Sequence, residues 1–215
     1  LPASSPSVRV LALIALLSLA APARDLSKVL RSVEQRYNRA ATLEVHFEQR
    51  YLAQGAGRRT TESGELALRK PGRMRWSYAA PAGKVFVSDG KVLWFYSPEE
   101  NREERSRMKD TEDFRAPLAF LLGKLDFRRD FGNFELNDTG ADSTIVALPK
   151  SDKLPYTRVE FTVTPQNEIR RLLVQGTDAT VMEFLFTNER LNTPVNDAIF
   201  RYTPPKGAEI MEAEQ

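Results

Sequence analysis

The sequence predicts a mainly β protein in which about ten or eleven strands form an antiparallel meander and two helices cover its concave face. Three observations predict this class. Apolar and polar residues alternate through most of the chain. The alternating runs are joined by short segments rich in turn residues, and only two segments have helical periodicity. Because a sheet of that many strands must curl, split or close, we expect one concave apolar face.

The composition excludes several classes of function. The chain has 215 residues, of which 41% are hydrophobic and 28% charged, which fits one globular domain. Its net charge of +2 argues against a dedicated nucleic-acid binder. Without cysteine and with a single histidine, the chain offers no disulfide, no thiolate nucleophile and no histidine pair for a metal. We therefore expect no cofactor and no metal site.

Residues 1–23 are typical of a secretory signal peptide. Arg9 supplies the positive charge, residues 10–20 are almost entirely apolar, and Ala21-Pro22-Ala23 matches a cleavage site. Eleven residues rise only about 16 Å as a helix, which is too short for about 30 Å of hydrocarbon. The alternative is a short membrane anchor. We expect export, removal of residues 1–23, and a soluble single domain over residues 24–215.

The first structural element is expected to be a helix over residues 25–40. Its apolar side chains recur at helical spacing and form one stripe, and Asp25 can cap its first turn. Such a stripe must pack on something apolar. Its members are Leu26, Val29, Leu30, Val33 and Tyr37.

The period then changes to two, which indicates strands. Asp89-Gly90 between two apolar runs predicts a hairpin. The charged run 103–108 is expected at an edge or half exposed. The expected strands cover residues 43–48, 64–68, 73–78, 85–87, 92–96, 103–108, 144–148, 158–163, 169–175, 180–187 and 197–203, with 127–131 and 134–137 as short candidates.

A second helix is expected over residues 114–124, where the alternation stops. Pro117 suits its first turn and Gly123 its end. Leu118, Leu121 and Leu122 make this helix apolar, so it is the second cover for the concave face.

No catalytic motif is present, and the charged clusters have two interpretations each. Acidic residues could supply the carboxylate pair of a glycoside hydrolase, or they could form a solvated loop and a charge-protected edge strand. Basic residues before and within one strand could meet anionic phosphates or form its polar outer face. His46 is expected on the polar face of its strand. The acidic set is Glu99, Glu100, Glu103, Glu104, Asp110, Glu112 and Asp113, and the basic set is Arg69, Lys70, Arg73 and Arg75.

One block of the sequence is specific enough to indicate a family. LRKPGRMRW at residues 68–76, Pro81 and VSDGKVLWFYSP at residues 87–98 resemble the LolA family of periplasmic carriers of outer-membrane lipoproteins. The resemblance covers nearly all of residues 24–210. It extends to the segments 47–49, 64–66, 116–122 and 200–207.

This resemblance implies a fold and a task. The implied fold is an incomplete antiparallel β-barrel of about eleven strands, covered by short lid helices over an apolar cavity, as in LolA and LolB. The implied protein is a periplasmic, monomeric, non-enzymatic chaperone. It would accept triacylated lipoproteins from an inner-membrane ABC exporter like LolCDE and deliver them to an outer-membrane acceptor like LolB. LolB itself is a lipoprotein, and the absence of a cysteine argues against that assignment here.

The alternation and the matched block together assign the acyl-chain site. In the family, an arginine before the conserved proline hydrogen-bonds to the lid helix and latches the closed form. Lys70, with Arg69 beside it, occupies that position here, and a lysine offers a point charge instead of a planar fork. The sheet side of the cavity is expected to comprise Leu43, Val45, Phe47, Leu66, Leu68, Met74, Trp76, Val87 and Trp94, and the lid side Leu30, Val33, Leu118, Leu121 and Leu122.

Three other functions remain open at this point. The first is another exported lipid- or glycolipid-binding module on the same fold, including an envelope-stress sensor. The second is an exported glycoside hydrolase that uses the acidic residues. The third is a structural or adhesive β module, which needs no cavity.

Overall fold

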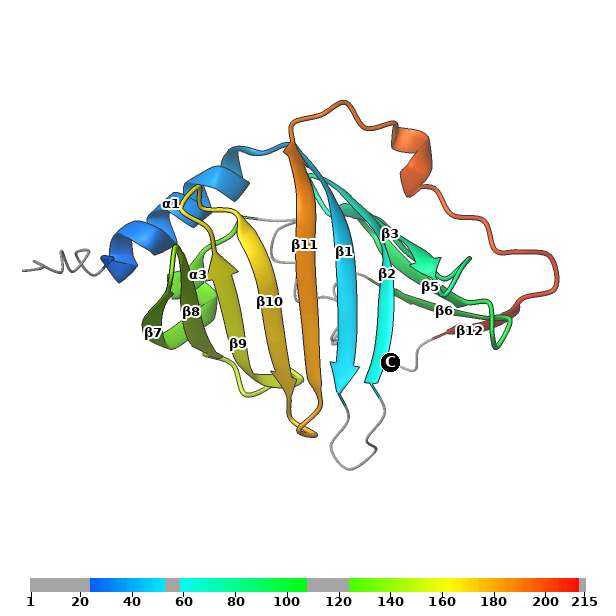
Figure 1. Cartoon of the computed structure of the whole chain (residues 1–215). Helices are drawn as coiled ribbons and strands as arrows, with labels where there is room; N and C mark the ends of the chain where they lie inside the picture. The colour runs from blue at the N-terminus through cyan, green and yellow to red at the C-terminus, as the bar shows by residue number, and fades with distance from the viewer. Residues whose placement is uncertain (1–23, 53–58, 108–123, 213–215) are drawn as a thin grey trace, which may run out of the picture.

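The computed structural model describes residues 24–52, 59–107 and 124–212, and most of them form one strongly curved sheet (Figure 1). The predicted signal peptide lies outside these ranges. So does the predicted helix 114–124, apart from its last residue.

The predicted first helix is confirmed as α1 (Leu26–Arg39). The Asp25 carboxylate accepts hydrogen bonds from the backbone N–H groups of Ser27 and Lys28, which caps the first turn. The apolar stripe faces the sheet, because Val29, Leu30, Val33 and Tyr37 are all buried. Figure 1 shows α1 across one end of the half of the sheet that contains β7 to β10.

Two antiparallel meanders make up the sheet. The first comprises β1 (Thr42–Leu52), β2 (Arg59–Arg69), β3 (Arg73–Ala80), β4 (Val85–Asp89), β5 (Val92–Ser97) and β6 (Arg102–Arg107). The second comprises β7 (Phe131–Thr139), β8 (Asp142–Pro149), β9 (Tyr156–Val163), β10 (Ile169–Gly176) and β11 (Val181–Leu191). Pairing between β1 and β11 joins them into one sheet of order β12-β6-β5-β4-β3-β2-β1-β11-β10-β9-β8-β7.

The last strand changes the expected strand count and the position of β6 in the sheet. β12 (Glu209–Glu212) pairs in parallel with β6, whereas the other strand pairs are antiparallel. The described residues therefore form twelve strands instead of about eleven. Of the two expectations for β6, the half-exposed strand is confirmed and the edge strand is not. The mainly β, antiparallel class is confirmed.

The sheet has an apolar inner face and a mixed outer face. Cross-strand neighbours share a face, so the register assigns each residue to one side. The inner face carries Phe47, Leu66, Trp76 and Leu172, which belong to one buried cluster with the stripe of α1. The outer face, with Arg75 as an example, has no part in that cluster. The inner face is thus the surface that α1 covers.

After β11 the chain returns over the outer face through residues 192–203, which we call the returning segment. The predicted strand 197–203 is wrong, because residues Asp197–Phe200 form a 3₁₀ helix, η2, capped by the Asn196 side chain. The Arg75 guanidinium donates to the Ile199 carbonyl, and Phe200 is buried against the sheet. The sequence of a short helix with one buried aromatic residue resembles that of a strand, because four residues are too few to distinguish a helical period from a strand period.

A similar error concerns residues 127–131. They were expected as a strand, but Phe127–Asp130 form the helix α3, capped by Asp126. Phe127 packs edge-on against Phe161 of β9, with ring centroids 5.2 Å apart. No helix in the described part of the chain is long and apolar enough to span a bilayer.

Candidate functional site

Most of the predicted cavity residues meet on the inner face of the sheet. The seven on β1 to β3 are at most 7% exposed, and they share one buried cluster with the two predicted residues of α1. The alternation therefore predicted their orientation correctly in these three strands. These residues are Leu43, Val45, Phe47, Leu66, Leu68, Met74 and Trp76, together with Leu30 and Val33.

Val87 and Trp94 are corrections to the predicted set. Val87 is the cross-strand neighbour of Arg75 and of Trp94, which places all three on the outer face. The Trp94 ring lies 6.2 Å from the Tyr202 ring of the returning segment. Phe86 and Leu93 occupy the inner face in their place. The apolar run on β4 has two buried faces here, so alternation cannot identify the inner one.

Leu118, Leu121 and Leu122, the other lid-side residues, lie outside the described ranges.

An aromatic cluster occupies the centre of the inner face. The Phe47 ring meets the Trp76 and Tyr78 rings edge-on at centroid distances of 4.7 and 5.0 Å, and Trp76 lies 5.5 Å from Phe184. Gly64 is the cross-strand neighbour of both Phe47 and Tyr78. The two rings can therefore meet over a position that has no side chain.

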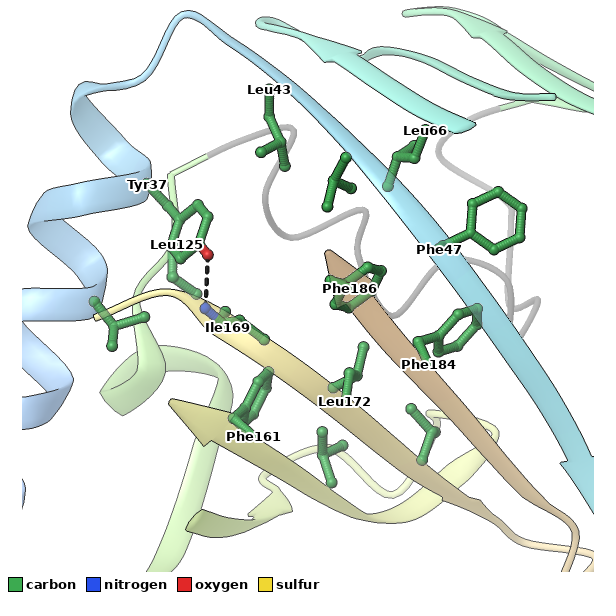
Figure 2. Close-up of a cluster of buried hydrophobic side chains, with 14 of the residues drawn as sticks. Tyr37, Leu43, Phe47, Leu66, Leu125, Phe161, Ile169, Leu172, Phe184 and Phe186 are labelled. Atoms are coloured by element: carbon green, nitrogen blue, oxygen red, sulfur yellow. Dashed lines mark hydrogen bonds between the residues drawn. The ribbon is translucent and has the colours of Figure 1, made fainter. Parts of the chain in front are cut away.

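The sequence assignment missed the half of the inner face that the second meander supplies. Figure 2 shows Phe161, Leu172, Phe184 and Phe186 of β9 to β11 beside Phe47 and Leu66. Their alternation is visible in the sequence, with Phe184 and Phe186 on one face of β11. The matched block ends before these strands, so nothing in it associated them with the site.

The described side chains pack closely where the last turn of α1 meets the sheet. A pocket bounded by Tyr37, Leu43, Leu66, Ile169 and Phe186 has only about 10 Å³ of free space, roughly the amount that one water needs. A larger pocket of about 500 Å³ lies farther along the inner face, where Glu62, Lys84 and Arg102 make its wall polar. At the pocket beside Tyr37 there is no space for an acyl chain as long as α1 keeps this position.

Tyr37 attaches α1 to the second meander. Its hydroxyl donates to Glu189 at 2.6 Å and accepts from the backbone N–H of Ile169 at 2.8 Å (Figure 2). Arg36 bridges the same Glu189 and Glu168. Burial and the neighbouring Glu189 carboxylate raise the pKa of Tyr37 well above its ordinary value, so this phenol stays protonated and can donate.

Lys70 attaches α1 to the first meander. Its ammonium donates to the carbonyls of Tyr37 at 2.6 Å and of Asn38 at 3.4 Å, in the last turn of α1. A cation at this end of a helix meets carbonyls that have no partner within the helix. Burial lowers the pKa of this ammonium. The predicted latch residue thus contacts the helix it is expected to hold.

Arg69 lies elsewhere. It donates to the Val195 carbonyl and pairs with Asp197, both in the returning segment over the outer face. Neither of these partners belongs to α1, so of the two predicted latch cations it is Lys70 that is placed to act as one.

A third set of hydrogen bonds connects α1 to the chain just before β7. The Asn38 side chain exchanges two hydrogen bonds with the backbone of Leu125, at 2.8 and 2.7 Å. Glu34 accepts from the Phe127 N–H at 2.8 Å. α1 and this segment are therefore coupled by polar contacts as well as by packing.

The acidic run of β6 is divided between the two faces. Glu103 is opposite Tyr96 on the outer face, whereas Glu104 is opposite Phe95 on the inner one. Burial raises the pKa of Glu103, and Glu104 pairs with Arg102. The cluster Asp110, Glu112 and Asp113 lies outside the described ranges. No group of three or more candidate metal ligands occurs among the described residues.

His46 stands on the outer face, as predicted, and its Nδ1 atom lies 2.9 Å from the carboxylate of Glu65.

Comparison with known proteins agrees with the sequence resemblance. The family model for the outer membrane lipoprotein carrier protein LolA matches residues 38–203. A carrier of this name from Azotobacter vinelandii is 29% identical over 209 residues, which cover 95% of this chain and 98% of that protein. Its counterpart from Nitrosomonas europaea is 24% identical over 185 residues, covering 86% and 89%. A solved LolA superfamily protein from Nitrosomonas europaea aligns with a TM-score of 0.47 at 11% identity, covering 84% of this chain and 99% of that one.

Proposed function

Because this chain belongs to the LolA family of outer-membrane lipoprotein carriers, we propose that it carries lipoproteins by covering their acyl chains with its inner face. The observation that carries the proposal is the continuous apolar inner face, part of which α1 covers and whose cover is held by polar contacts in the last turn of α1. LolA carriers are non-enzymatic transporters of the periplasm.

The cost of exposing acyl chains explains why a carrier is needed. Each methylene that leaves an apolar environment costs about 0.8 kcal/mol, so a chain of about sixteen carbons costs about 13 kcal/mol. Three such chains exceed the affinity of almost any noncovalent complex. Extraction from a membrane therefore needs an external energy source, and the carrier must bind more weakly than the full transfer value.

Competition between α1 and the ligand would provide this weaker binding. In the closed form, Leu30 and Val33 cover the surface that acyl chains would occupy. On loading, the inner face buries the ligand and no longer buries the apolar side chains of α1. The affinity therefore reflects only the difference between these two burial free energies. Release then follows when α1 returns, and the chain needs no nucleotide site of its own.

The proposal includes the partners and the location that the family resemblance implies. An inner-membrane ABC exporter like LolCDE loads triacylated lipoprotein, and an outer-membrane acceptor like LolB receives it. Residues 1–23 act as a signal peptide for export to the periplasm, and residues 24–215 form the carrier domain. The apolar run and cleavage site described above support this division.

The test is transfer of a labelled lipoprotein from vesicles that contain the exporter. With ATP, this protein is expected to bring the lipoprotein into the supernatant as a one-to-one complex. The matched control is the same polypeptide with its acylated cysteine replaced by serine, presented without a membrane. Binding of this unacylated polypeptide with equal affinity would contradict the proposal, because recognition would then not require acyl chains.

A further inference from the structure

A polar group lies inside the apolar inner face and makes no hydrogen bond within the described part of the chain. The Nε1–H group of Trp76 is buried and has no partner there, and the residue is only 2% exposed. Buried donors in native proteins are nearly always paired, so an unpaired one needs an explanation. The explanation we consider is a ligand that pairs with it.

Two further polar side chains lie in the same region. The Tyr78 hydroxyl donates to Gln49 Oε1 at 3.1 Å, and Gln49 Nε2 donates to the Met182 sulfur at 3.6 Å. Gln49 is only 6% exposed. Thioether sulfur is a weak acceptor, so the Gln49 amide still has donor capacity for a stronger one. The Phe47 ring contacts both Trp76 and Tyr78.

These three residues lie between the apolar region and the polar pocket. Tyr78 follows Trp76 on the inner face of β3, and the Lys84 ammonium lies 4.6 Å from the Tyr78 ring centroid. Lys84 in turn belongs to the polar wall of the pocket of about 500 Å³. The inner face thus changes from apolar beneath α1, through buried donors, to a charged pocket.

A polypeptide that carries a diacylglyceryl group changes in polarity in the same order. Its hydrocarbon chains are apolar, its ester carbonyls accept hydrogen bonds but donate none, and its polypeptide is polar. We propose that Trp76 Nε1–H and the Gln49 amide form a subsite for the ester carbonyls at the head of the acyl chains. The inference rests on the proposed function and deepens it, because it makes the ester linkage a determinant of affinity.

The experiment compares two probes of equal chain length, a short-chain diacylglyceryl-cysteine lipopeptide and its dialkyl-ether analogue. The ether lacks both carbonyls but keeps the hydrocarbon. We expect the full chain to bind the ester about fivefold more tightly, the contribution of one net hydrogen bond. Trp76→Phe removes the N–H group, keeps an aromatic ring, and is expected to abolish this preference.

Trp94→Phe is the matched control, because Trp94 is the only other tryptophan and lies on the outer face. It is expected to keep the ester preference. It also leaves Trp76 as the single indole, so the N–H resonance of that indole is expected to move downfield with the ester and not with the ether. This spectrum reports the hydrogen bond even if Trp76→Phe fails to fold.

The possible outcomes separate the two proposals. Ester preference in the unmodified protein together with a downfield indole shift supports the subsite. Binding of both probes with equal affinity and no shift overturns the subsite and leaves the carrier function standing. Binding of neither probe overturns both.

Discussion

At position 64 the packing of the inner face requires glycine, because any side chain would collide with the neighbouring strand. A Cβ atom built there would lie 2.1 Å from the Ser77 carbonyl oxygen and 2.8 Å from the Tyr78 Cα atom. Both are backbone atoms of the neighbouring strand, so neither can move without shifting β3. The edge-on contact between Phe47 and Tyr78 therefore requires glycine at this position.

Gly64→Ala is accordingly expected to destabilise the protein by about 3 kcal/mol, the upper range for overpacking. Thermal or urea unfolding measures the effect. Gly140→Ala is the control, because its φ of +66° strains alanine although no atom lies within 4 Å of the added group. That strain costs about 1–2 kcal/mol. An equal or smaller loss at Gly64 would contradict the steric argument.

The two tryptophans show when the alternation of apolar and polar residues predicts the face of a side chain and when it does not. Alternation placed Trp76 correctly, because the outer face of β3 is polar at Arg73 and Arg75. It misplaced Trp94 because β5 is apolar on both faces. The second apolar face exists because the returning segment with Phe200 and Tyr202 covers it. That cover is a long-range contact, which no local pattern contains.

At the scale of elements, Lys70 and Arg69 are neighbours in sequence that hold different parts of the chain. Lys70 holds the end of α1, and Arg69 holds the returning segment. Arg69 is the last residue of β2 and follows the inner-face residue Leu68, so its side chain points to the outer face. Lys70 belongs to the turn after β2, where its backbone N–H donates to the Ala41 carbonyl close to the end of α1.

Lys70→Met is expected to loosen α1 selectively. It removes charge-assisted hydrogen bonds to the last turn, so protection of the α1 amides against hydrogen exchange should fall by about tenfold. Arg69→Met is the matched control, and it should leave α1 unchanged while exposing the amides near Asp197. Equal loosening of α1 in both variants would show that Lys70 does not act as a latch.

Helices and strands differed in how well the sequence predicted them. α1 was predicted almost to its ends, because a long apolar stripe and a capping aspartate agree. α3 and η2 were mistaken for strands, because four residues contain too little periodicity. β12 was not predicted at all. Its sequence is short and acidic, and it forms only because β6 offers an edge.

At the scale of the whole molecule, the packing between the last turn of α1 and the sheet supports the proposed competition between α1 and the ligand. The pocket bounded by Tyr37 and Phe186 has free space for about one water, so hydrocarbon does not fit at that point while α1 is in place. The sequence predicted the apolar surface but could not predict whether it is empty or filled. Packing density depends on how two meanders and a helix meet, and local patterns do not encode that.

Competition between α1 and the ligand makes a prediction that distinguishes it from binding in a preformed cavity. Val33 is fully buried on the side of α1 that faces the sheet, and Val33→Ala is expected to lower the free energy of unfolding by about 2 kcal/mol. If α1 leaves the sheet on loading, Val33→Ala destabilises the loaded form less than it destabilises the closed form. Affinity for the diacyl lipopeptide should therefore rise, by about fivefold if half of the loss is avoided.

Val87→Ala is the matched control, because Val87 is equally buried but lies on the outer face. It should lower stability by a similar amount and leave lipopeptide affinity unchanged. Titration calorimetry and thermal unfolding of the two variants test both expectations together. Weaker binding in Val33→Ala would mean that Val33 stabilises the loaded form, through contact with the ligand, more than it stabilises the closed form. In that case α1 would be a wall of the loaded site, and its displacement would not set the affinity.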